Sequence, residues 1–412
     1  MEKPRIKTPV LEYWGFKKHP FDDYILRDKR LSLFVNREDE LHQLHNSLSN
    51  RLTGVYGSQG VGKSSFLRKF EQILRKSGLS VAYVHLTGTT ERALYREILA
   101  AILTCHIEGS IKTLKKLKLN SKRELDRVEF SIRLTRESEL GAEAVLKGSI
   151  KESTEKSIEP HTEESARALT RDIINNTKTA FVIIVDDLER MKHFMEDDAA
   201  YFRFISSFAR TVDESFSDES VAFVVSLDED FVSRLAPDFS NVQGAISFSF
   251  GELQELRCFE PQQLVELIKK RLEEVKWSKS LTEFITNDAF WTLLITTGGH
   301  ARRSLAVLRA AMEYVERNKK QKKLDTECVR AGMATRGEII DDKDLTIVQF
   351  LTEFGPHSAS DEDFQKSVGL TRKRLSEHLK TLSEQIGLKI TKAATGTTTK
   401  DLFSLPEIQL DN

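Results

Sequence analysis

The sequence feature that most restricts the fold is a glycine-rich stretch at residues 56–65, "YGSQGVGKSS", at the end of an apolar run at 52–56. Gly57, Gly60, Gly62, Lys63 and Ser64 fit the spacing G-x-x-x-x-G-K-[ST]. Glycines allow positive φ and let backbone N–H groups approach an anion closely. The spacing is not G-x-G-x-x-G, which makes a dinucleotide site the weaker interpretation. We therefore expect a strand, a phosphate-binding loop and a helix in succession.

The stretch after the loop, at 64–76, is amphipathic and stops before Gly78. A helix there would direct the positive end of its dipole at the phosphates. Lys63 would reach the β- and γ-phosphates of ATP, and Ser64 would hold Mg²⁺. The residues expected to contact the nucleotide are Gly57, Ser58, Gly60, Val61, Gly62, Lys63, Ser64 and Ser65.

A second motif, "AFVIIVDDLER", places two acids at the end of an apolar run at 181–185. Asp186, at the tip of a buried strand, is positioned to bind Mg²⁺ directly or through water. Asp187 is then the candidate that orients or deprotonates the attacking water. The alternative interpretation is that the two acids are only the solvated end of a strand.

Apolar runs alternate with helical patterns along much of the chain, which indicates an α/β fold with a buried parallel sheet. The strands are expected at 52–56, 81–86, 181–185, 221–227 and 246–250, and the helices between them at 64–76, 91–105 and 198–212. After residue 255 the pattern is helical, at 261–275, 281–296 and 302–317.

A compact unit follows near residue 340. Its pattern predicts three helices, at 345–354, 360–368 and 371–385, and two short strands, at 388–392 and 401–405. Three helices and a two-stranded wing describe a winged helix. The predicted organisation is an N-terminal linker and helix (1–50), a P-loop core (51–255) with an insertion at about 107–178, a helical lid (256–335) and the winged helix (341–412).

The insertion is too long for an ordinary connection. Its part at 111–127 carries seven Lys/Arg against two Asp/Glu, and the part at 128–153 shows partial period-two alternation typical of a hairpin. The basic run is either a solvated helix face or a contact for an acidic partner.

Composition limits the class of protein. The chain has 412 residues, 39% of them apolar, and a net charge of −1, so its overall charge does not indicate nucleic acid binding. Cys105, Cys258 and Cys328 form neither a metal spacing nor an obvious disulfide set. The N-terminus has no apolar signal core, and no run approaches membrane-spanning length. We expect a cytoplasmic protein that does not contact a membrane.

With these motifs the chain resembles an AAA+ ATPase of the additional-strand P-loop class. It is most similar to the origin-recognition or initiator-type ATPases and to the bacterial TniB/ExeA/TnsC group, over about residues 10–335. "LFVNREDELHQL", with Arg37-Glu38-Asp39-Glu40, resembles the box before the phosphate loop of initiator ATPases. "YWGFKKHPF" at 13–21 resembles the opening of ExeA/TniB-like ATPases.

The resemblance implies roles for three further residues. "GGHARRSL" resembles the second-sensor motif, which would place Arg302 at the γ-phosphate; otherwise Arg302 is a surface arginine. Ser226 lies at the first-sensor position and would hold the attacking water; otherwise it is an ordinary strand-end serine. Arg234 is the candidate arginine finger from a neighbouring subunit, with Arg210 and Arg257 as rivals.

One departure from the family pattern concerns the acid pair. Most AAA+ proteins have Asp-Glu where this chain has Asp186-Asp187. The shorter second acid predicts slow hydrolysis, or a contribution from Glu189. Paired aspartates also resemble the KAP and STAND signalling ATPases, which keeps a second functional class open.

The predicted winged helix offers a DNA-binding surface. Arg372, Lys373 and Arg374 lie in the first turn of its recognition helix, and Lys392 and Lys400 flank the wing tip. Nine Lys/Arg against twelve Asp/Glu at 341–412 give a net charge of −3, which favours protein docking instead.

The sequence thus predicts an oligomeric ATP-dependent AAA+ switch that uses ATP and Mg²⁺ and binds DNA, in initiation, transposition targeting or mobile-element maintenance. The alternatives are a STAND/KAP-like signalling or antiviral-defence ATPase that recruits a protein effector, and a nucleotide-binding scaffold with negligible turnover.

Overall fold

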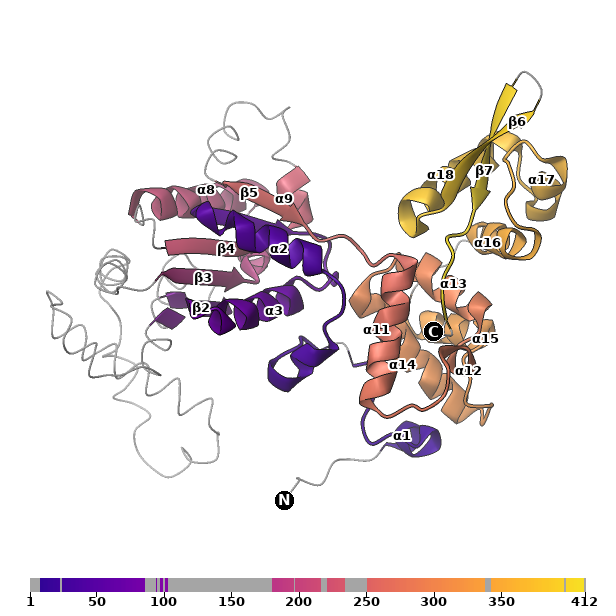
Figure 1. Ribbon diagram of the computed structural model, residues 1–412, viewed down its shortest axis with the longest axis horizontal. Helices are drawn as coiled ribbons and strands as arrows, with labels where there is room; N and C mark the ends of the chain where they lie inside the picture. Colours follow the sequence, from indigo (N-terminus) through magenta and orange to yellow (C-terminus); the bar gives the residue numbers. More distant parts are fainter. Residues whose placement is uncertain are drawn as a thin grey trace, which may run out of the picture. The chain divides into compact units, whose positions relative to one another are not determined.

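The computed structural model describes residues 8–22, 24–85, 180–195, 197–215, 221–233, 250–337, 342–395 and 398–410, with residues 94, 97–98 and 101–102. The chain divides into two compact units. The sheet unit comprises Arg37–Ser58 and Lys63–Leu256, and the helical unit comprises Met1–Asn36, Gln59–Gly62 and Arg257–Asn412. Figure 1 draws both, with the C-terminal part of the helical unit in orange and yellow.

The sheet unit is built on five strands. They are β1 (Leu52–Tyr56), β2 (Ser80–His85), β3 (Phe181–Asp186), β4 (Val221–Leu227) and β5 (Glu252–Glu255). Their order is β2-β3-β4-β1-β5, and every neighbouring pair is parallel. β4 therefore lies between the strand that enters the phosphate loop and the strand that ends in the acid pair. This is the additional strand that the sequence resemblance implied.

β3 and β4 are buried along their whole length, as their near-continuous apolar sequences predict for a parallel sheet covered on both faces. Phe181, Ile183 and Val185 of β3 pack in one cluster with α8 (Asp198–Ser215). Leu94, Ile98 and Ile102 join the same cluster. They are helical, but the rest of the helix predicted at 91–105 lies outside the described residues.

α3 (Lys63–Lys76) follows the phosphate loop and contacts β2 and β3. It buries Phe66, Leu67, Phe70 and Leu74, whose spacing of three and four residues forms one helical stripe. The unit also contains α2 (Glu38–Asn46) and α9 (Glu229–Ser233), and two short 3₁₀ helices, η2 (Ser47–Ser49) and η3 (Leu188–Phe194).

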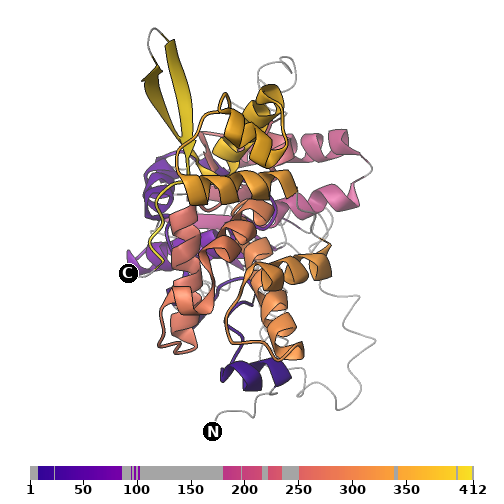
Figure 2. The same ribbon diagram turned by 90° about the vertical axis from the view of Figure 1, so that its right-hand side faces the viewer.

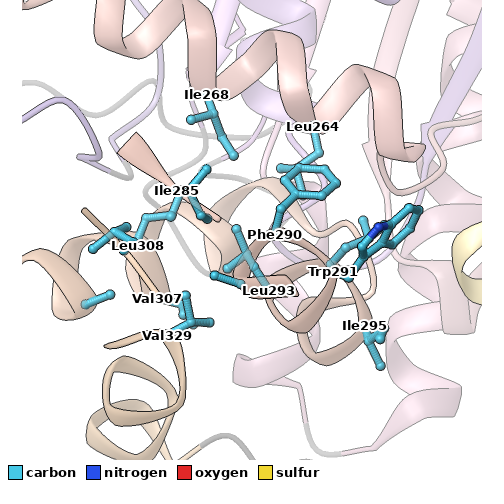
Figure 3. Close-up of a cluster of buried hydrophobic side chains, with 14 of the residues drawn as sticks. Leu264, Ile268, Ile285, Phe290, Trp291, Leu293, Ile295, Val307, Leu308 and Val329 are labelled. Carbon is cyan, nitrogen blue, oxygen red and sulfur yellow. The ribbon is translucent and has the colours of Figure 1, made fainter. Parts of the chain in front are cut away.

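The helical unit has a continuous apolar core formed by α11 (Pro261–Glu274), α12 (Leu281–Phe284), α13 (Asn287–Thr297), α14 (Ala301–Arg317) and α15 (Thr326–Arg336). Figure 3 shows Leu264, Phe290 and Leu308 directed into this core from three of these helices. α14 and α15 pack closely at Gly332, where an added Cβ would lie 2.7 Å from the Val307 carbonyl oxygen.

The N-terminal segment carries more structure than the linker expected from the sequence. α1 (Pro9–Trp14) and the 3₁₀ helix η1 (Asp28–Leu33) form here. The Trp14 indole is buried and donates from Nε1 to the Met312 carbonyl at 3.2 Å, and its ring packs against Phe284. The aromatic residues of the 13–21 motif thus anchor the segment to the helical core.

The C-terminal part of the helical unit contains α16 (Asp342–Phe354), α17 (Glu362–Val368) and α18 (Arg372–Ile386), followed by an antiparallel hairpin of β6 (Lys389–Thr395) and β7 (Thr398–Ser404). Figure 2 shows the hairpin extending beyond the three helices. We call this part the helix–hairpin segment. Its element order agrees with the one predicted from the sequence.

The strand expected at 246–250 falls almost wholly outside the described residues, and the edge strand next to β1 is β5 at Glu252–Glu255. Two other expectations need correction. The single helix expected at 281–296 is two helices, because Ile285 is extended and forms a bridge with Leu324. α15 was not expected, although Asp325 caps it by accepting from the Cys328 N–H. None of the helices in the described part of the chain has the length and apolar character needed to span a membrane.

Candidate functional site

The phosphate loop has the backbone that its glycines suggest. Gly57, Gly60 and Gly62 have φ of 150°, 93° and 113°, a region where side chains on L-residues are strained. Lys63 follows and begins α3, so the helix N-terminus points into the loop. The Lys63 ammonium is buried and donates to the Gly57 carbonyl at 2.7 Å. The lysine is therefore folded back over the loop, where it can meet phosphate.

The acid at the tip of β3 is joined to the start of α3. The Ser64 hydroxyl donates to Asp186 Oδ1 at 3.2 Å, and the Asp187 N–H donates to the same oxygen at 3.0 Å. Tyr83 on β2 donates its hydroxyl to Asp186 Oδ2 at 2.7 Å. Both oxygens of this buried carboxylate are thus oriented.

Ser64 and Asp186 are the donors expected of a magnesium site. Mg²⁺ in nucleotide sites takes one or two protein oxygens, and substrate phosphates and water complete the octahedron. Within the described residues, no group of three or more His, Cys, Asp or Glu side chains could hold a metal ion by itself. A hydroxyl and a carboxylate at hydrogen-bonding distance therefore fit Mg²⁺ bound together with ATP.

Tyr83 is held as a hydrogen-bond donor. Burial and the negative charge of Asp186 raise its pKa well above the ordinary value. The Arg68 guanidinium lies over its ring, with Cζ 3.3 Å from the ring centroid. The phenol stays protonated and orients the carboxylate.

Asp187 turns the chain sharply. Its φ of 61° is left-handed, a conformation that Asp tolerates better than most residues, and it precedes η3. Its carboxylate lies 3.8 Å from the Arg190 guanidinium. Two residues further on, Glu189 Oε2 lies 3.0 Å from Lys63 Nζ. The acid that reaches the phosphate-loop lysine is therefore Glu189.

Ser226 lies on β4 opposite Val55 of β1, in the middle of the sheet. Its hydroxyl is buried and has no hydrogen-bond partner among the described residues. Leaving a buried hydroxyl unpaired is costly, so a water or a ligand oxygen is expected there. A buried hydroxyl that can bond a water is what the first-sensor role predicted from the resemblance requires.

Arg302 is exposed at the start of α14. Its backbone N–H donates to the Gly60 carbonyl at 3.2 Å, and both residues belong to the helical unit. The preceding Gly299 has φ of 71° and lies against Phe259, where an added Cβ would be 2.1 Å from the carbonyl oxygen. The second glycine of "GGHARRSL" is therefore required by close packing.

The candidate arginine finger, Arg234, lies outside the described residues, and its rivals Arg210 and Arg257 are both exposed. In the helix–hairpin segment, Arg372, Lys373, Arg374 and Lys392 are exposed and Lys400 is half-buried. Lys392 is paired in register with Asp401, which offsets one positive charge of the hairpin.

A family model described as an ATPase domain predominantly from Archaea matches residues 34–285, more than half of the chain. The chain belongs to this family of ATPase domains. The α/β fold predicted from the sequence, a phosphate loop on a buried parallel sheet, is confirmed, and so is the ATP hydrolase class. No match was found among curated proteins.

Several solved structures resemble the ATPase over most of its length. The Aeropyrum pernix ORC1 protein in complex with DNA is 16% identical, with 93% of this chain and 92% of that chain covered and a TM-score of 0.41. The Aeropyrum pernix ORC2 protein, in ADPNP-ADP complexes, is 14% identical, with 95% and 94% covered and a TM-score of 0.45. The Thermotoga maritima RuvB Holliday junction branch migration motor is 14% identical, with 92% and 96% covered and a TM-score of 0.39. No function follows from resemblance at this level.

Two polar contacts at the ends of the sheet strands were not predicted from the sequence. Tyr83 is 103 positions from Asp186, and only the parallel pairing of β2 with β3 brings them together. Lys192 on η3 pairs with Asp228, just after β4, at 3.2 Å and with Asp230 at 3.5 Å. Burial lowers the Lys192 pKa, but these carboxylates outweigh it and raise the pKa. No local motif marks either residue.

Proposed function

We propose that the ATPase is an oligomeric switch that couples ATP binding and hydrolysis to DNA binding by its helix–hairpin segment. The observation that carries the DNA part of this proposal is the first turn of α18. Arg372, Lys373 and Arg374 are all exposed, whereas the apolar residues that follow, Leu375 and Leu379, are buried. Three cations at the free end of a helix, beside a two-stranded hairpin, match the way a winged helix meets the major groove.

In this proposal ATP binds with its β- and γ-phosphates at Lys63 and the loop N–H groups. Ser64 and Asp186 hold Mg²⁺, which would polarise the phosphates. Ser226 supplies a hydroxyl for the attacking water, and Arg302 reports the state of the γ-phosphate. An arginine from a neighbouring subunit, Arg234 or one of its rivals, would complete the site, so that ATP favours assembly.

The acid pair predicts slow turnover where Asp187 acts as the only base, and a contribution from Glu189 is the alternative. Asp187 is one methylene shorter than the glutamate usual at this position, and its carboxylate lies near Arg190. We infer a switch that remains assembled for long periods, as expected of an initiator-type protein, and not a fast motor.

A signalling role remains the second candidate because the helix–hairpin segment is acidic overall. Residues 341–412 carry a net charge of −3, which disfavours DNA away from the α18 cluster. In that case the segment would dock a protein effector.

The test is to measure ATP turnover and assembly by size-resolved light scattering, with and without duplex DNA. We expect ATP-dependent assembly and faster turnover with DNA at low salt. No DNA binding at low salt, together with turnover stimulated only by a protein partner, would reject the DNA switch in favour of signalling. Tight ATP binding with no turnover under any condition would indicate a scaffold.

A further inference from the structure

The acid nearest to the phosphate-loop lysine is three positions beyond the magnesium ligand of β3. Lys63 Nζ lies 3.0 Å from Glu189 Oε2, and the side chains are 7% and 23% exposed. The same ammonium is expected to bind the terminal phosphates of ATP. A phosphate oxygen that takes the place of Glu189 at Lys63 therefore lies next to the displaced carboxylate. A small rotation of the Glu189 side chain leaves room for one water that is hydrogen-bonded to both groups.

Asp187 is directed elsewhere. The left-handed turn at this residue starts η3, and the Asp187 carboxylate lies near Arg190 at the surface. The turn places the next acid, Glu189, back over the loop. Glu189 follows Asp186 by three positions, whereas Asp187 follows it directly.

Glu189 is also rigidly held. Leu188 and Met191, on either side of it in η3, are fully buried in the sheet-unit core. Lys192 fixes the same short helix to the end of β4 through Asp228 at 3.2 Å. A general base requires this kind of support, because small displacements from the reacting atoms are costly.

Burial raises the Glu189 pKa, although the positive charge of Lys63 opposes the shift. A carboxylate with a raised pKa is a stronger base at neutral pH than an ordinary surface carboxylate. This property supports the geometric argument and agrees with a role in proton transfer.

We propose that Glu189, and not Asp187, is the general base for ATP hydrolysis, and that its ion pair with Lys63 must open before ATP can bind. ATP phosphates take over Lys63 and release the Glu189 carboxylate toward the attacking water. A bond then forms between the water oxygen and the γ-phosphorus. The bond from that phosphorus to the β–γ bridging oxygen breaks, and its electron pair stays with ADP. The water proton moves to Glu189 and leaves from there to solvent.

This inference rests on the proposed placement of ATP phosphates at Lys63. The test compares Glu189→Gln with Asp187→Asn, and measures both the dissociation constant of a fluorescent ATP analogue and the turnover of ATP without DNA. Asp213→Asn, which removes the exposed ion pair with Arg51 in the same unit, serves as the control. If the wild-type protein does not bind the analogue, the proposed nucleotide site is wrong. The role of Glu189 as base is judged only from the turnover of variants that bind the analogue.

We expect Glu189→Gln to bind the analogue severalfold more tightly, because Lys63 no longer has a competing carboxylate. Its turnover should fall by about 10²- to 10⁴-fold, the usual contribution of a general base. Asp187→Asn should lose less turnover, and Asp213→Asn should match wild type in both measurements.

Two outcomes would overturn the proposal. In one, Asp187→Asn abolishes turnover while Glu189→Gln keeps it. In the other, Glu189→Gln binds the analogue more tightly but hydrolyses ATP at the wild-type rate. The ion pair would then control ATP binding, and Glu189 would not be the base. If Glu189→Gln does not fold, Glu189→Asp keeps the charge but withdraws the carboxylate. Turnover at least tenfold lower, with affinity equal to or higher than that of wild type, would then support the base, and wild-type turnover would exclude it.

Discussion

The two polar regions of this molecule are built in opposite ways. In the sheet unit, Lys63, Asp186 and Ser226 are all buried, and hydrogen bonds hold the two charged groups in place. In the helix–hairpin segment, the three cations of α18 are exposed. A site that performs chemistry needs preorganised, desolvated groups, whereas a surface that reads a polyanion needs accessible charge. The two regions should therefore respond very differently to substitution.

The largest effect is expected at Lys63. Lys63→Ala removes the cation that is folded over the phosphate loop and leaves Glu189 as a largely buried carboxylate without its ion pair. Hydrogen bonds to charged groups contribute about 1.5–3 kcal/mol each. We expect ATP affinity to fall by at least about 100-fold, measured by titration with a fluorescent analogue. Lys76→Ala, at the exposed end of α3, is the control, and wild-type affinity in Lys63→Ala would refute the site.

The exposed cluster should give a smaller, salt-dependent effect. Replacing Arg372, Lys373 and Arg374 together by Ala should make the slope of log affinity against log salt less steep, by roughly 0.9 for each phosphate that the variant no longer binds. Replacing the exposed Lys319, Lys322 and Lys323 by Ala removes the same charge elsewhere in the helical unit and should leave the slope nearly unchanged.

A competing location for DNA is the basic stretch at 112–127, with seven positive charges. The same salt series on a variant with its lysines and arginines replaced decides between the two. An unchanged slope for the α18 variant, with a slope near zero for the 112–127 variant, would assign DNA binding to the insertion. The exposed surface to compare with the buried nucleotide site would then be the insertion and not α18.

The contrast between the regions also explains what the sequence could predict. The phosphate loop and Asp186 are local motifs, because phosphate binding requires glycines, a lysine and a hydroxyl at fixed spacing. The boundaries of α17 and α18 were predicted within about two residues, because Gly369 and Gly387 end them in left-handed caps. Each of these signals consists of residues close together in the sequence, so it can be recognised without knowing the fold.

The remaining contacts depend on topology. The Tyr83 and Asp186 pair exists only because β2 lies beside β3 in parallel register, and the Lys192 and Asp228 pair only because η3 contacts the end of β4. The reach of Glu189 to Lys63 depends on a left-handed residue at 187 that is not glycine. No pattern in a single sequence specifies these arrangements.

The smallest effect concerns two tyrosine hydroxyls of the sheet unit. Tyr83 donates to the buried Asp186 carboxylate at 2.7 Å. The Tyr201 hydroxyl is buried in α8 and has no hydrogen-bond partner among the described residues. Burial, and after it the charges of Asp228 and Glu189, raises the Tyr201 pKa, so this phenol is neutral. The two tyrosines therefore carry the same buried hydroxyl, but among the described residues only that of Tyr83 has a hydrogen-bond partner.

We expect Tyr83→Phe to destabilise the β2–β3 pair by about 1–3 kcal/mol, because a charged acceptor loses its donor. Tyr201→Phe should change stability by less than about 0.5 kcal/mol or increase it, since it removes an unpaired buried polar atom. Native-state hydrogen exchange at β3 amides measures both, because it reports the free energy of local opening without assuming that two units unfold together. Equal losses for both variants would mean that a water or ligand oxygen satisfies Tyr201. That result, combined with lower ATP turnover in Tyr201→Phe, would place its hydroxyl with Glu189 in the reacting site and extend the buried polar region to α8.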